Sequence, residues 1–259
     1  MPKLNRQLIE RYLLLIVALE FMTLGIIFTV HAELGITPIS CPVYVLSLKF
    51  SPTLGEFTTG MHVLFVLLQI ILLRDKYEKI QLFQLVIGVV FGLLIDFNNL
   101  LLGNIYPTSY ITRIIFVCIG SFSIAIGVVF EFVIKTIIVA GEGLVFAIIT
   151  VTNWPLNKTK IGFDLSLLFI SVVLSLYYFG DIVGIREGTV ISALLVGYFA
   201  GIIKPFVMPK LIDFIYRKCP EKKNEKHFND SLFIYDDDDI NNNDNGIRNI
   251  KDKFINELS

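Results

Sequence analysis

The sequence has few charged residues, and many of those are concentrated near its C-terminal end. Only 17% of the 259 residues are Asp, Glu, Lys or Arg, whereas a soluble domain has about 25%. Residues 217–259 hold 18 of the 45 charged side chains. The preceding positions therefore contain long stretches without the charge that a water-facing surface needs, which excludes an ordinary soluble domain.

Cysteine and net positive charge are also scarce. The three cysteines, Cys41, Cys118 and Cys219, are far apart in the sequence and form neither a CxxC motif nor a disulfide framework. The formal net charge is −1, and no basic stripe with interleaved aromatic residues indicates nucleic-acid binding. Zinc-hydrolase and serine-hydrolase motifs are missing. We therefore expect no nucleic-acid partner, no metal site, no cofactor and no enzymatic activity.

Long apolar runs dominate what is present. Hydrophobic residues make up 54% of the chain and the mean hydropathy is +0.71. A helix needs roughly 17–25 residues to cross about 30 Å of hydrocarbon. Six runs are that long: 12–31, 57–73, 80–102, 111–134, 161–180 and 187–206. The first run is too long for the core of a signal peptide, so we expect it to remain as an uncleaved helix.

Two shorter apolar stretches, 36–50 and 136–153, are interrupted by helix-breaking residues. Pro38 and Pro42 interrupt the first, and Gly141-Glu142-Gly143 interrupts the second. Irregular backbone at membrane depth is tolerated only inside protein or beside a water-filled cavity. We therefore interpret both stretches as re-entrant or broken helices. The alternative is that both cross the membrane, which would give eight helices.

The distribution of Lys and Arg favours six crossings. If both short stretches return to the side from which they entered, the basic residues of segments 1–11, 74–79 and 158–160 face the cytoplasm, and the uncharged loop 103–110 faces outward. Cytoplasmic loops carry an excess of Lys and Arg. Eight crossings would place the 74–79 loop outside. We therefore expect a multi-pass protein of the cell membrane with both termini in the cytoplasm.

The two halves of the chain, residues 12–102 and 111–206, resemble each other. Three segments match, two at an offset of 102 residues and one at 109: 24–28 with 126–130, 60–62 with 162–164, and 88–92 with 197–201. Each half would contain one helix, one broken segment and two further helices. Three crossings per half is an odd number, so the halves must run in opposite senses through the membrane.

The predicted fold is therefore all-α and integral to the membrane, with about six transmembrane helices and two short broken segments arranged as two inverted repeats. This is a recurring plan of transporters, in which the substrate site lies near the bilayer midplane. The glycine pairs of segments 88–92 and 197–201 let helix backbones approach closely. We expect that contact inside the bundle, and a homo-oligomer is the alternative.

Beyond the last apolar run the chain becomes polar. Residues 207–216, which include Pro209, form a short stretch that we expect at the membrane interface. Residues 217–259 contain runs of four aspartates and three asparagines. Such a composition cannot bury enough apolar surface to fold, and it predicts a disordered cytoplasmic tail.

Three short motifs rich in glycine mark the two breaks and the start of the last helix. They are Leu34-Gly35-Ile36-Thr37-Pro38, Ala140-Gly141-Glu142-Gly143-Leu144 and Glu187-Gly188-Thr189. In this order of helices they resemble the bacterial YczE/YyaS/YitT-type membrane proteins over about residues 12–206. The resemblance implies a duplicated multi-helix membrane protein that is often supposed to be a transporter. One position departs from the family pattern: the acid expected two residues after the motif proline is Ser40, whereas the second half keeps Glu142.

Acidic residues inside the apolar runs are the candidate binding groups, because a charge at the bilayer centre costs about 2.5–3.5 kcal/mol and needs a compensating role. Glu20 lies near the middle of the first helix, and it could instead be a hydrogen-bonded core acid. Glu131 lies near the end of the fourth helix, and instead of binding a ligand it could pair with Lys135, four residues further on. Asp164 is expected in the first turn of its helix, where a carboxylate favourably meets the helix dipole.

The broken segments supply the remaining candidates. Gly141 and Gly143 let the chain turn sharply around Glu142, which could instead cap the following helix. Pro38 and Ser40 mark the first break. We expect a secondary transporter or channel that binds a small solute or ion at these residues, with the lipid bilayer as its other partner. The alternative function is a non-transporting scaffold or accessory protein of another membrane complex.

Overall fold

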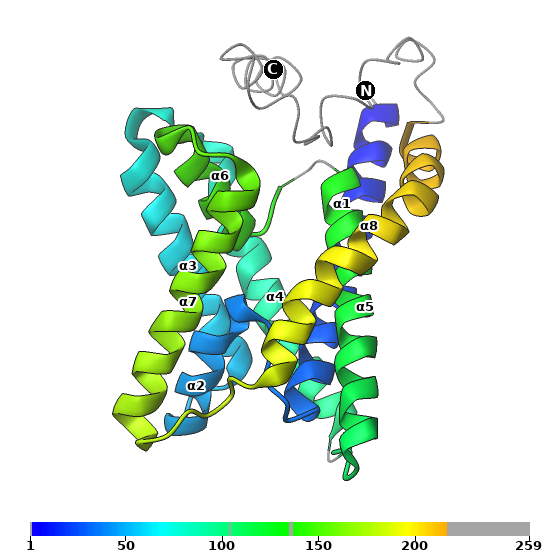
Figure 1. The fold of residues 1–259 in the computed structure, drawn as a ribbon. Coiled ribbons are helices and arrows are strands. Elements are labelled where there is room, and N and C mark those ends of the chain that lie inside the picture. Colours follow the sequence, from blue (N-terminus) through cyan, green and yellow to red (C-terminus); the bar gives the residue numbers. More distant parts are fainter. Residues whose placement is uncertain (1, 104, 135–136, 217–259) are drawn as a thin grey trace. The chain divides into compact units, whose positions relative to one another are not determined.

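The computed structural model describes residues 2–103, 105–134 and 137–216, and all regular structure in these ranges is helical (Figure 1). The eight α-helices of this part of the chain are α1 (Pro2–His31), α2 (Cys41–Lys49), α3 (Leu54–Leu73), α4 (Phe83–Leu102), α5 (Tyr110–Ile134), α6 (Ala140–Thr152), α7 (Leu156–Phe179) and α8 (Glu187–Tyr216). The prediction of an all-α membrane protein is confirmed.

Six of these helices are long and apolar enough to cross a bilayer. The apolar spans that these helices form contain 22 to 25 residues each, and those of α3 and α4 also include the adjoining 3₁₀ turns, Arg74–Lys76 and Lys79–Leu82. The two remaining helices, α2 with 9 residues and α6 with 13, are much shorter. At 1.5 Å per residue α6 is only about 20 Å long, which is less than the roughly 30 Å of hydrocarbon that a crossing needs. Among the described residues, six helices are therefore of crossing length, and the two short helices are those at the predicted breaks.

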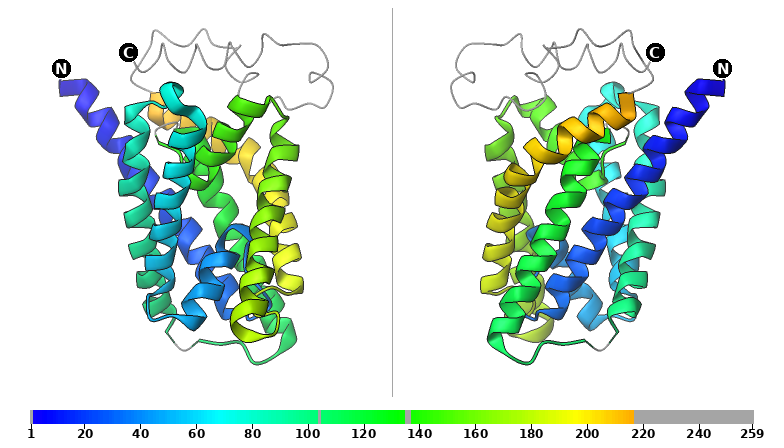
Figure 2. Two further views of the ribbon diagram at one scale, coloured as in Figure 1. Left: turned by 90° about the vertical axis from the view of Figure 1, so that its left-hand side faces the viewer. Right: turned by 90° about the vertical axis from the view of Figure 1, so that its right-hand side faces the viewer.

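The connections between helices fall at two opposite ends of the bundle formed by residues 2–215. The start of α1, the α3–α4 and α6–α7 connections and the last turns of α8 lie at one end, and the α2–α3, α4–α5 and α7–α8 connections lie at the other (Figures 1 and 2). The described segments that we predicted to be cytoplasmic thus share one end. The predicted disordered tail, residues 217–259, lies outside the described residues.

Helices α1 and α5 cross each other in opposite directions, and small residues let them come close. A Cβ added to Gly25 would lie 2.5 Å from the carbonyl oxygen of Gly120, and one added to Gly127 would lie 2.5 Å from that of Ala18. An offset of 102 residues carries positions 18 and 25 onto positions 120 and 127. The two contacts are therefore copies of each other, as an inverted repeat requires.

Two further contacts join a residue to its own counterpart in the other half. The Ser123 hydroxyl donates a hydrogen bond of 2.6 Å to the carbonyl oxygen of Phe21, 102 residues away. The side chain of Ile39 contacts Gly141, also 102 residues away. A residue can touch its own symmetry mate only at the axis that relates the two halves. Ile39 and Gly141 belong to the two breaks, so both broken segments meet at this pseudo-two-fold axis.

Each short helix packs against the opposite half of the chain. Helix α2 lies against α7, and α6 lies against α3. Phe65 and Val66 of α3, Leu144 and Val145 of α6 and Phe163 of α7 belong to one buried apolar cluster. From their adjacent starting points α2 and α6 run towards opposite ends of the bundle (Figure 1). The irregular backbone at each break is thereby enclosed by protein, which is the condition for its presence at membrane depth.

Helix α8 extends further than predicted. We expected it to end at Phe206, but it continues to Tyr216 with Pro205 and Pro209 inside it. Each proline removes one backbone hydrogen bond and bends the helix without necessarily ending it, and the residues around them are still mostly apolar. Figure 2 shows α8 changing direction in its second half. Residues 207–216 are therefore the continuation of a bent helix.

Candidate functional site

The second break is built from small residues that bring the start of α6 to the pseudo-two-fold axis. Val139 has an extended backbone, with ψ of 144°, and supplies no capping side chain. The Cδ1 atom of Ile39 lies 2.5 Å from the place where a Cβ of residue 141 would be, so only glycine fits there without displacement. The first amide groups of a helix lack intrahelical acceptors and form its positive end. That end of α6 therefore lies beside the first break.

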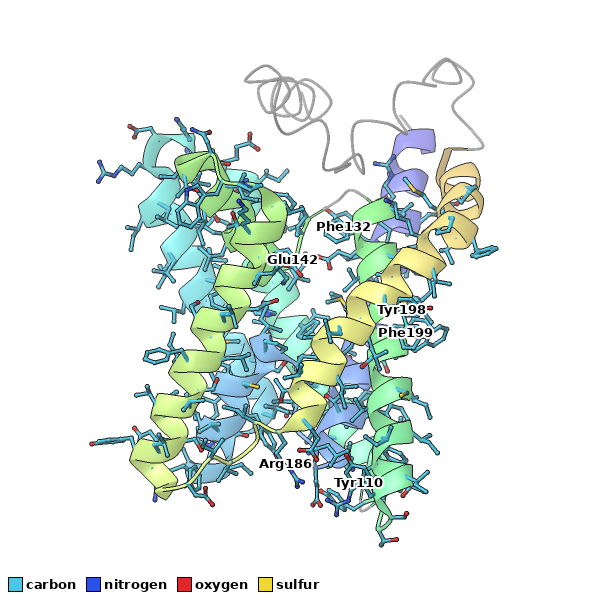
Figure 3. The ribbon with its side chains drawn as sticks, in the orientation of Figure 1. Tyr110, Phe132, Glu142, Arg186, Tyr198 and Phe199 are labelled. Atoms are coloured by element: carbon cyan, nitrogen blue, oxygen red, sulfur yellow. The ribbon has the colours of Figure 1, made fainter. Side chains whose placement is uncertain are left out.

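Glu142, in the first turn of α6, forms an ion pair with Lys160 of α7. The Lys160 Nζ atom lies 3.3 and 3.1 Å from the two carboxylate oxygens of Glu142. The same ammonium lies 3.6 Å from a carboxylate oxygen of Asp164, one turn further along α7. The side chains of Glu142 and Asp164 are 19% and 27% exposed, so a ligand can reach them. Figure 3 shows Glu142 at the beginning of α6, on the side that faces α5.

Glu131 of α5 belongs to the same region. Its side chain is buried, and its Oε1 atom accepts a hydrogen bond of 2.6 Å from the backbone N–H of Val139. Its Oε2 atom has no hydrogen-bond partner in the part of the chain that the structure describes. Glu142 and Lys160 are close enough to act on it electrostatically. Glu131 therefore has one buried oxygen whose hydrogen-bonding capacity is unused within the described part of the chain. The alternative pairing with Lys135 falls outside the described residues.

Two buried amide side chains hold the start of α6 in place. The Gln69 Nε2 atom of α3 donates hydrogen bonds to the Gln84 Oε1 atom of α4, at 2.9 Å, and to the carbonyl oxygen of Ala140, at 3.1 Å. Gly143 packs against both amides. Helices of the first half thus position the break of the second half.

The first break is less polar. Pro38 begins a short 3₁₀ turn, Pro38–Ser40, and the Ser40 hydroxyl accepts a hydrogen bond of 3.1 Å from the Thr37 hydroxyl. Pro38 and Ser40 are buried. Ser40 occupies the repeat position of Glu142, so it presents a hydroxyl group where the second half presents a carboxylate. The acidic groups of the site therefore come from the second half alone.

The glycine motif that precedes the first break anchors the start of α8. The carbonyl oxygen of Leu34 accepts a hydrogen bond of 2.7 Å from the N–H of Gly188. Gly35 has a φ of +101°, which glycine adopts readily and other residues do not. It packs against Arg186 and Thr189 at the beginning of α8. Two of the three motifs singled out in the sequence are thus in direct contact.

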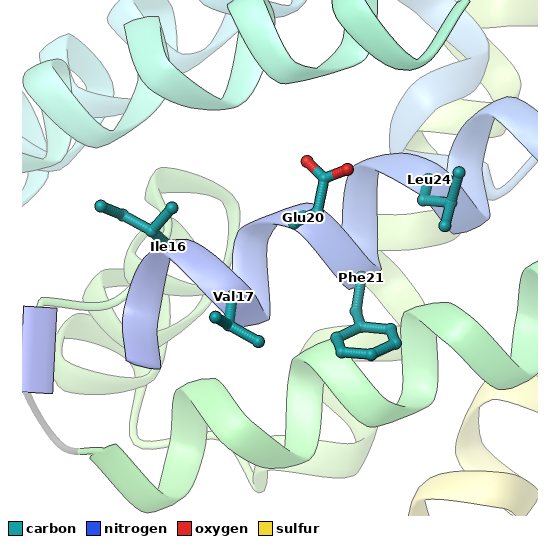
Figure 4. A pocket seen from close by; sticks show the side chains of 5 residues that line it. All are labelled: Ile16, Val17, Glu20, Phe21 and Leu24. Carbon is teal, nitrogen blue, oxygen red and sulfur yellow. The ribbon is translucent and has the colours of Figure 1, made fainter. Parts of the chain in front are cut away.

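Glu20 lies apart from these ion pairs. It lines an open pocket of about 320 Å³ together with Ile16, Val17, Phe21 and Leu24, all from α1 (Figure 4). Among the described residues it forms none of the salt bridges found around Glu142. Within the described part of the chain, Glu20 is therefore separate from these ion pairs and lies among apolar side chains of α1.

The structure thus brings Glu131, Glu142 and Asp164 together, with Lys160 among them. We refer to these four residues as the acidic cluster. The predicted place of Asp164 was wrong: α7 begins at Leu156, so Asp164 lies beyond the first turn and faces Lys160. Sequence reasoning missed Lys160 because a lysine beside an apolar run was interpreted as a topological charge. Its spacing of four residues from Asp164 is the signal for a pair on one helix face.

The cluster is acidic in character. It combines three carboxyl groups with one ammonium, and the two carboxylates that pair with Lys160, those of Glu142 and Asp164, already outnumber its single positive charge. Such a site favours a proton, a small cation or a solute that carries a positive group. It lies where the irregular backbone of both breaks is enclosed, which is the usual place of a substrate site in an inverted-repeat transporter.

Comparison with known proteins gives a family but no relative of established activity. Residues 9–205 match a family described as a family of unknown function (DUF6198). No curated protein and no solved structure matches the chain. The matched region includes both breaks, the acidic cluster and the contacts at the pseudo-two-fold axis. The chain therefore belongs to the family DUF6198.

Proposed function

We propose that this protein is a secondary transporter that carries a small solute or ion through a site at the meeting point of the two broken segments. The contact between Ile39 and Gly141 carries this proposal. It brings the starts of two interrupted helices together at the axis of an inverted repeat, beside a cluster of partly accessible carboxylates. That arrangement recurs in transporters, where the repeat interface holds the substrate.

The chemistry of the cluster narrows the ligand. Within the described residues, Glu142 and Asp164 share one ammonium, that of Lys160, and one oxygen of Glu131 has no hydrogen-bond partner. A positively charged ligand would offset the excess negative charge and compete with Lys160 for the carboxylates. A small cation, a protonated amine or a proton is therefore the favoured ligand or coupling ion.

The proposal also includes the membrane location, the orientation of the termini and the family resemblance that the sequence suggests. The distribution of Lys and Arg supports a cell-membrane location with both termini in the cytoplasm. The three glycine motifs support a place among the YczE/YyaS/YitT-type proteins, whose members are often supposed to be transporters.

A ligand screen on purified protein tests the site. The melting temperature would be measured with a panel of small cations, amines and neutral metabolites for three proteins: wild type, Glu142→Gln and the control Asp75→Asn, which removes an exposed charge in the α3–α4 connection. A ligand at a hundred times its Kd stabilises a folded protein by about 2.7 kcal/mol. We expect a compound that stabilises wild type and Asp75→Asn but not Glu142→Gln.

Uptake of that compound into proteoliposomes tests transport itself. Accumulation above that of protein-free liposomes, and its loss in Glu142→Gln, is the expected result. Equal stabilisation of all three proteins would contradict the site, and binding without uptake would contradict transport. The latter result would favour the alternative, a non-transporting scaffold.

A further inference from the structure

The two halves of the chain differ in the packing of their last two helices. In the first half α4 lies directly on α3, and small residues make the contact. Gly88 packs against the side chain of His62, and Gly92 packs against Gly55 and Thr59. The hydroxyl of Thr59 also donates a hydrogen bond of 3.4 Å to the carbonyl oxygen of Gly88. This half is closed along the α3–α4 interface.

The equivalent interface of the second half is open. Gly197 and Gly201 are the counterparts of Gly88 and Gly92, and no described atom lies within 4 Å of a Cβ added to either of them. Helices α7 and α8 form no extended contact within residues 156–216. Only 11% of the apolar span of α8 is buried, whereas 33% of the α4 span is buried. The glycine face of α8 is therefore built like that of α4 but lacks its neighbour.

The internal symmetry indicates which neighbour fits. The α1–α5 contacts and the meeting of the breaks follow the two-fold relation closely, so the two halves have the same packing available to them. The counterparts of Thr59 and His62 are Ile161 and Asp164 of α7. A closed second half would bring Ile161 against Gly201 and Asp164 against Gly197. In an inverted repeat, a conformation with the first half closed and the second half open implies an alternative conformation. In that alternative the first half is open and the second half is closed.

We infer that the Gly197/Gly201 face of α8 is a docking surface for α7 of the same chain, occupied in a second conformation in which α4 has separated from α3. This inference rests on the proposed transport function. Because Asp164 belongs to the acidic cluster, closure of α8 over α7 would cover the cluster from one side. Opening of α3 and α4 in the same step would uncover the repeat interface from the other half.

Disulfide trapping in native membranes tests this inference. In a chain whose three cysteines are replaced by serine, Ile161→Cys and Gly201→Cys would be combined. A disulfide needs Cβ atoms about 3.5–4.5 Å apart, and the Gly201 position has no neighbour that close in the present conformation. We expect an oxidant to form an intramolecular disulfide, detected as loss of both free thiols at unchanged mass on a denaturing gel.

A shift of one residue provides the matched control. Gly162→Cys with Gly201→Cys moves one thiol by about 100° around α7, onto a face that is open in both halves, since Gly60 and Gly162 both lack neighbours. We expect no disulfide there. The pair Asp164→Cys and Gly197→Cys provides a second test of the same interface if one variant does not fold.

A lock on the first half tests the exchange itself. The Thr53 hydroxyl lies 2.6 Å from a carboxylate oxygen of Asp96 across the α3–α4 interface, so Thr53→Cys with Asp96→Cys should form a disulfide in the present conformation. In a chain that carries both cysteine pairs, we expect that the 161–201 disulfide does not form once the 53–96 disulfide is in place.

Three results would overturn the inference. They are absence of both α7–α8 disulfides while the 53–96 disulfide forms, a 161–201 disulfide that the lock does not affect, and a band of doubled mass, which would make the glycine face an interface between two copies. None of these results depends on Glu142 or on a ligand, so they leave the proposed site to its own test.

Discussion

At the scale of single residues, the two carboxyl oxygens of Glu131 have different surroundings, and the proposed site would give them two separable roles. One of its oxygens accepts a hydrogen bond from the Val139 amide and so fixes the entry into α6, and the other has no partner among the described residues. The first role is structural and needs only an oxygen acceptor. The second role, binding a ligand or a proton, needs a carboxyl group, because the amide of glutamine does not gain and lose a proton near neutral pH. Substitutions can therefore distinguish them.

We predict that Glu131→Gln keeps the stability of the protein and that Glu131→Ala loses it. Glutamine retains an oxygen for the Val139 amide, whereas alanine leaves that buried N–H without a partner, which costs about 1–3 kcal/mol. The melting temperature of each variant, determined from the folded protein that remains on size-exclusion chromatography after heating, measures the difference. Equal melting temperatures for the two variants would show that the bond to Val139 does not hold α6.

At the scale of elements, the crossing of α1 and α5 is the contact on which both halves depend. No hydrophobic force drives helices together inside lipid, so close backbone approach through small residues has to supply the packing. Gly25, Gly120, Gly127 and Ala18 provide it. A larger side chain at any of the three glycines must displace a carbonyl oxygen of the partner helix.

We predict that Gly25→Leu prevents normal folding and that Gly60→Leu does not. The new side chain at residue 25 would begin 2.5 Å from the carbonyl oxygen of Gly120, whereas residue 60 has nothing within 4 Å. Overpacking of this kind typically costs 1–3 kcal/mol. The yield of monodisperse protein after detergent extraction checks this pair. A normal yield for Gly25→Leu would mean that α1 and α5 can shift apart at little cost.

The elements could largely be predicted from the sequence, and their pairing only in part. Run length identified six helices of crossing length, and glycine and proline identified both breaks, because length and backbone conformation are local properties. The repeat was also visible. The packing of α2 on α7 and of α6 on α3 was not, because apolar faces inside a membrane carry no sign that selects a partner. For the same reason the Lys160 pair was missed: its importance depends on where α6 begins in space.

At the scale of the whole molecule, the arrangement of connections makes a sidedness test decisive. The α3–α4 connection lies at the same end as the start of α1, and the α4–α5 connection lies at the opposite end (Figure 1). Only the first of these connections carries Lys and Arg. If the bundle is inserted as the positive-inside rule requires, one loop is inside and the other outside.

We predict that Lys76→Cys is protected from a membrane-impermeant maleimide in intact cells and that Thr108→Cys reacts. Both positions are exposed, so access from outside is the only variable, and permeabilised cells should label both. The cysteine-free chain serves as the blank. Reaction at position 76 and protection at position 108 would show that the protein has the opposite orientation.

The exchange of short helices between the halves has a consequence for how the chain is made. Helix α2 leaves the ribosome about a hundred residues before α7, the helix that covers it. At a synthesis rate of about 5–20 residues per second, roughly 5 to 20 s pass between the synthesis of the first break and that of α7. The irregular backbone of this break is not tolerated against lipid, so during that interval it has to remain at the bilayer surface or within the insertion machinery. Helix α6 faces no such delay, because α3 has been synthesised before it.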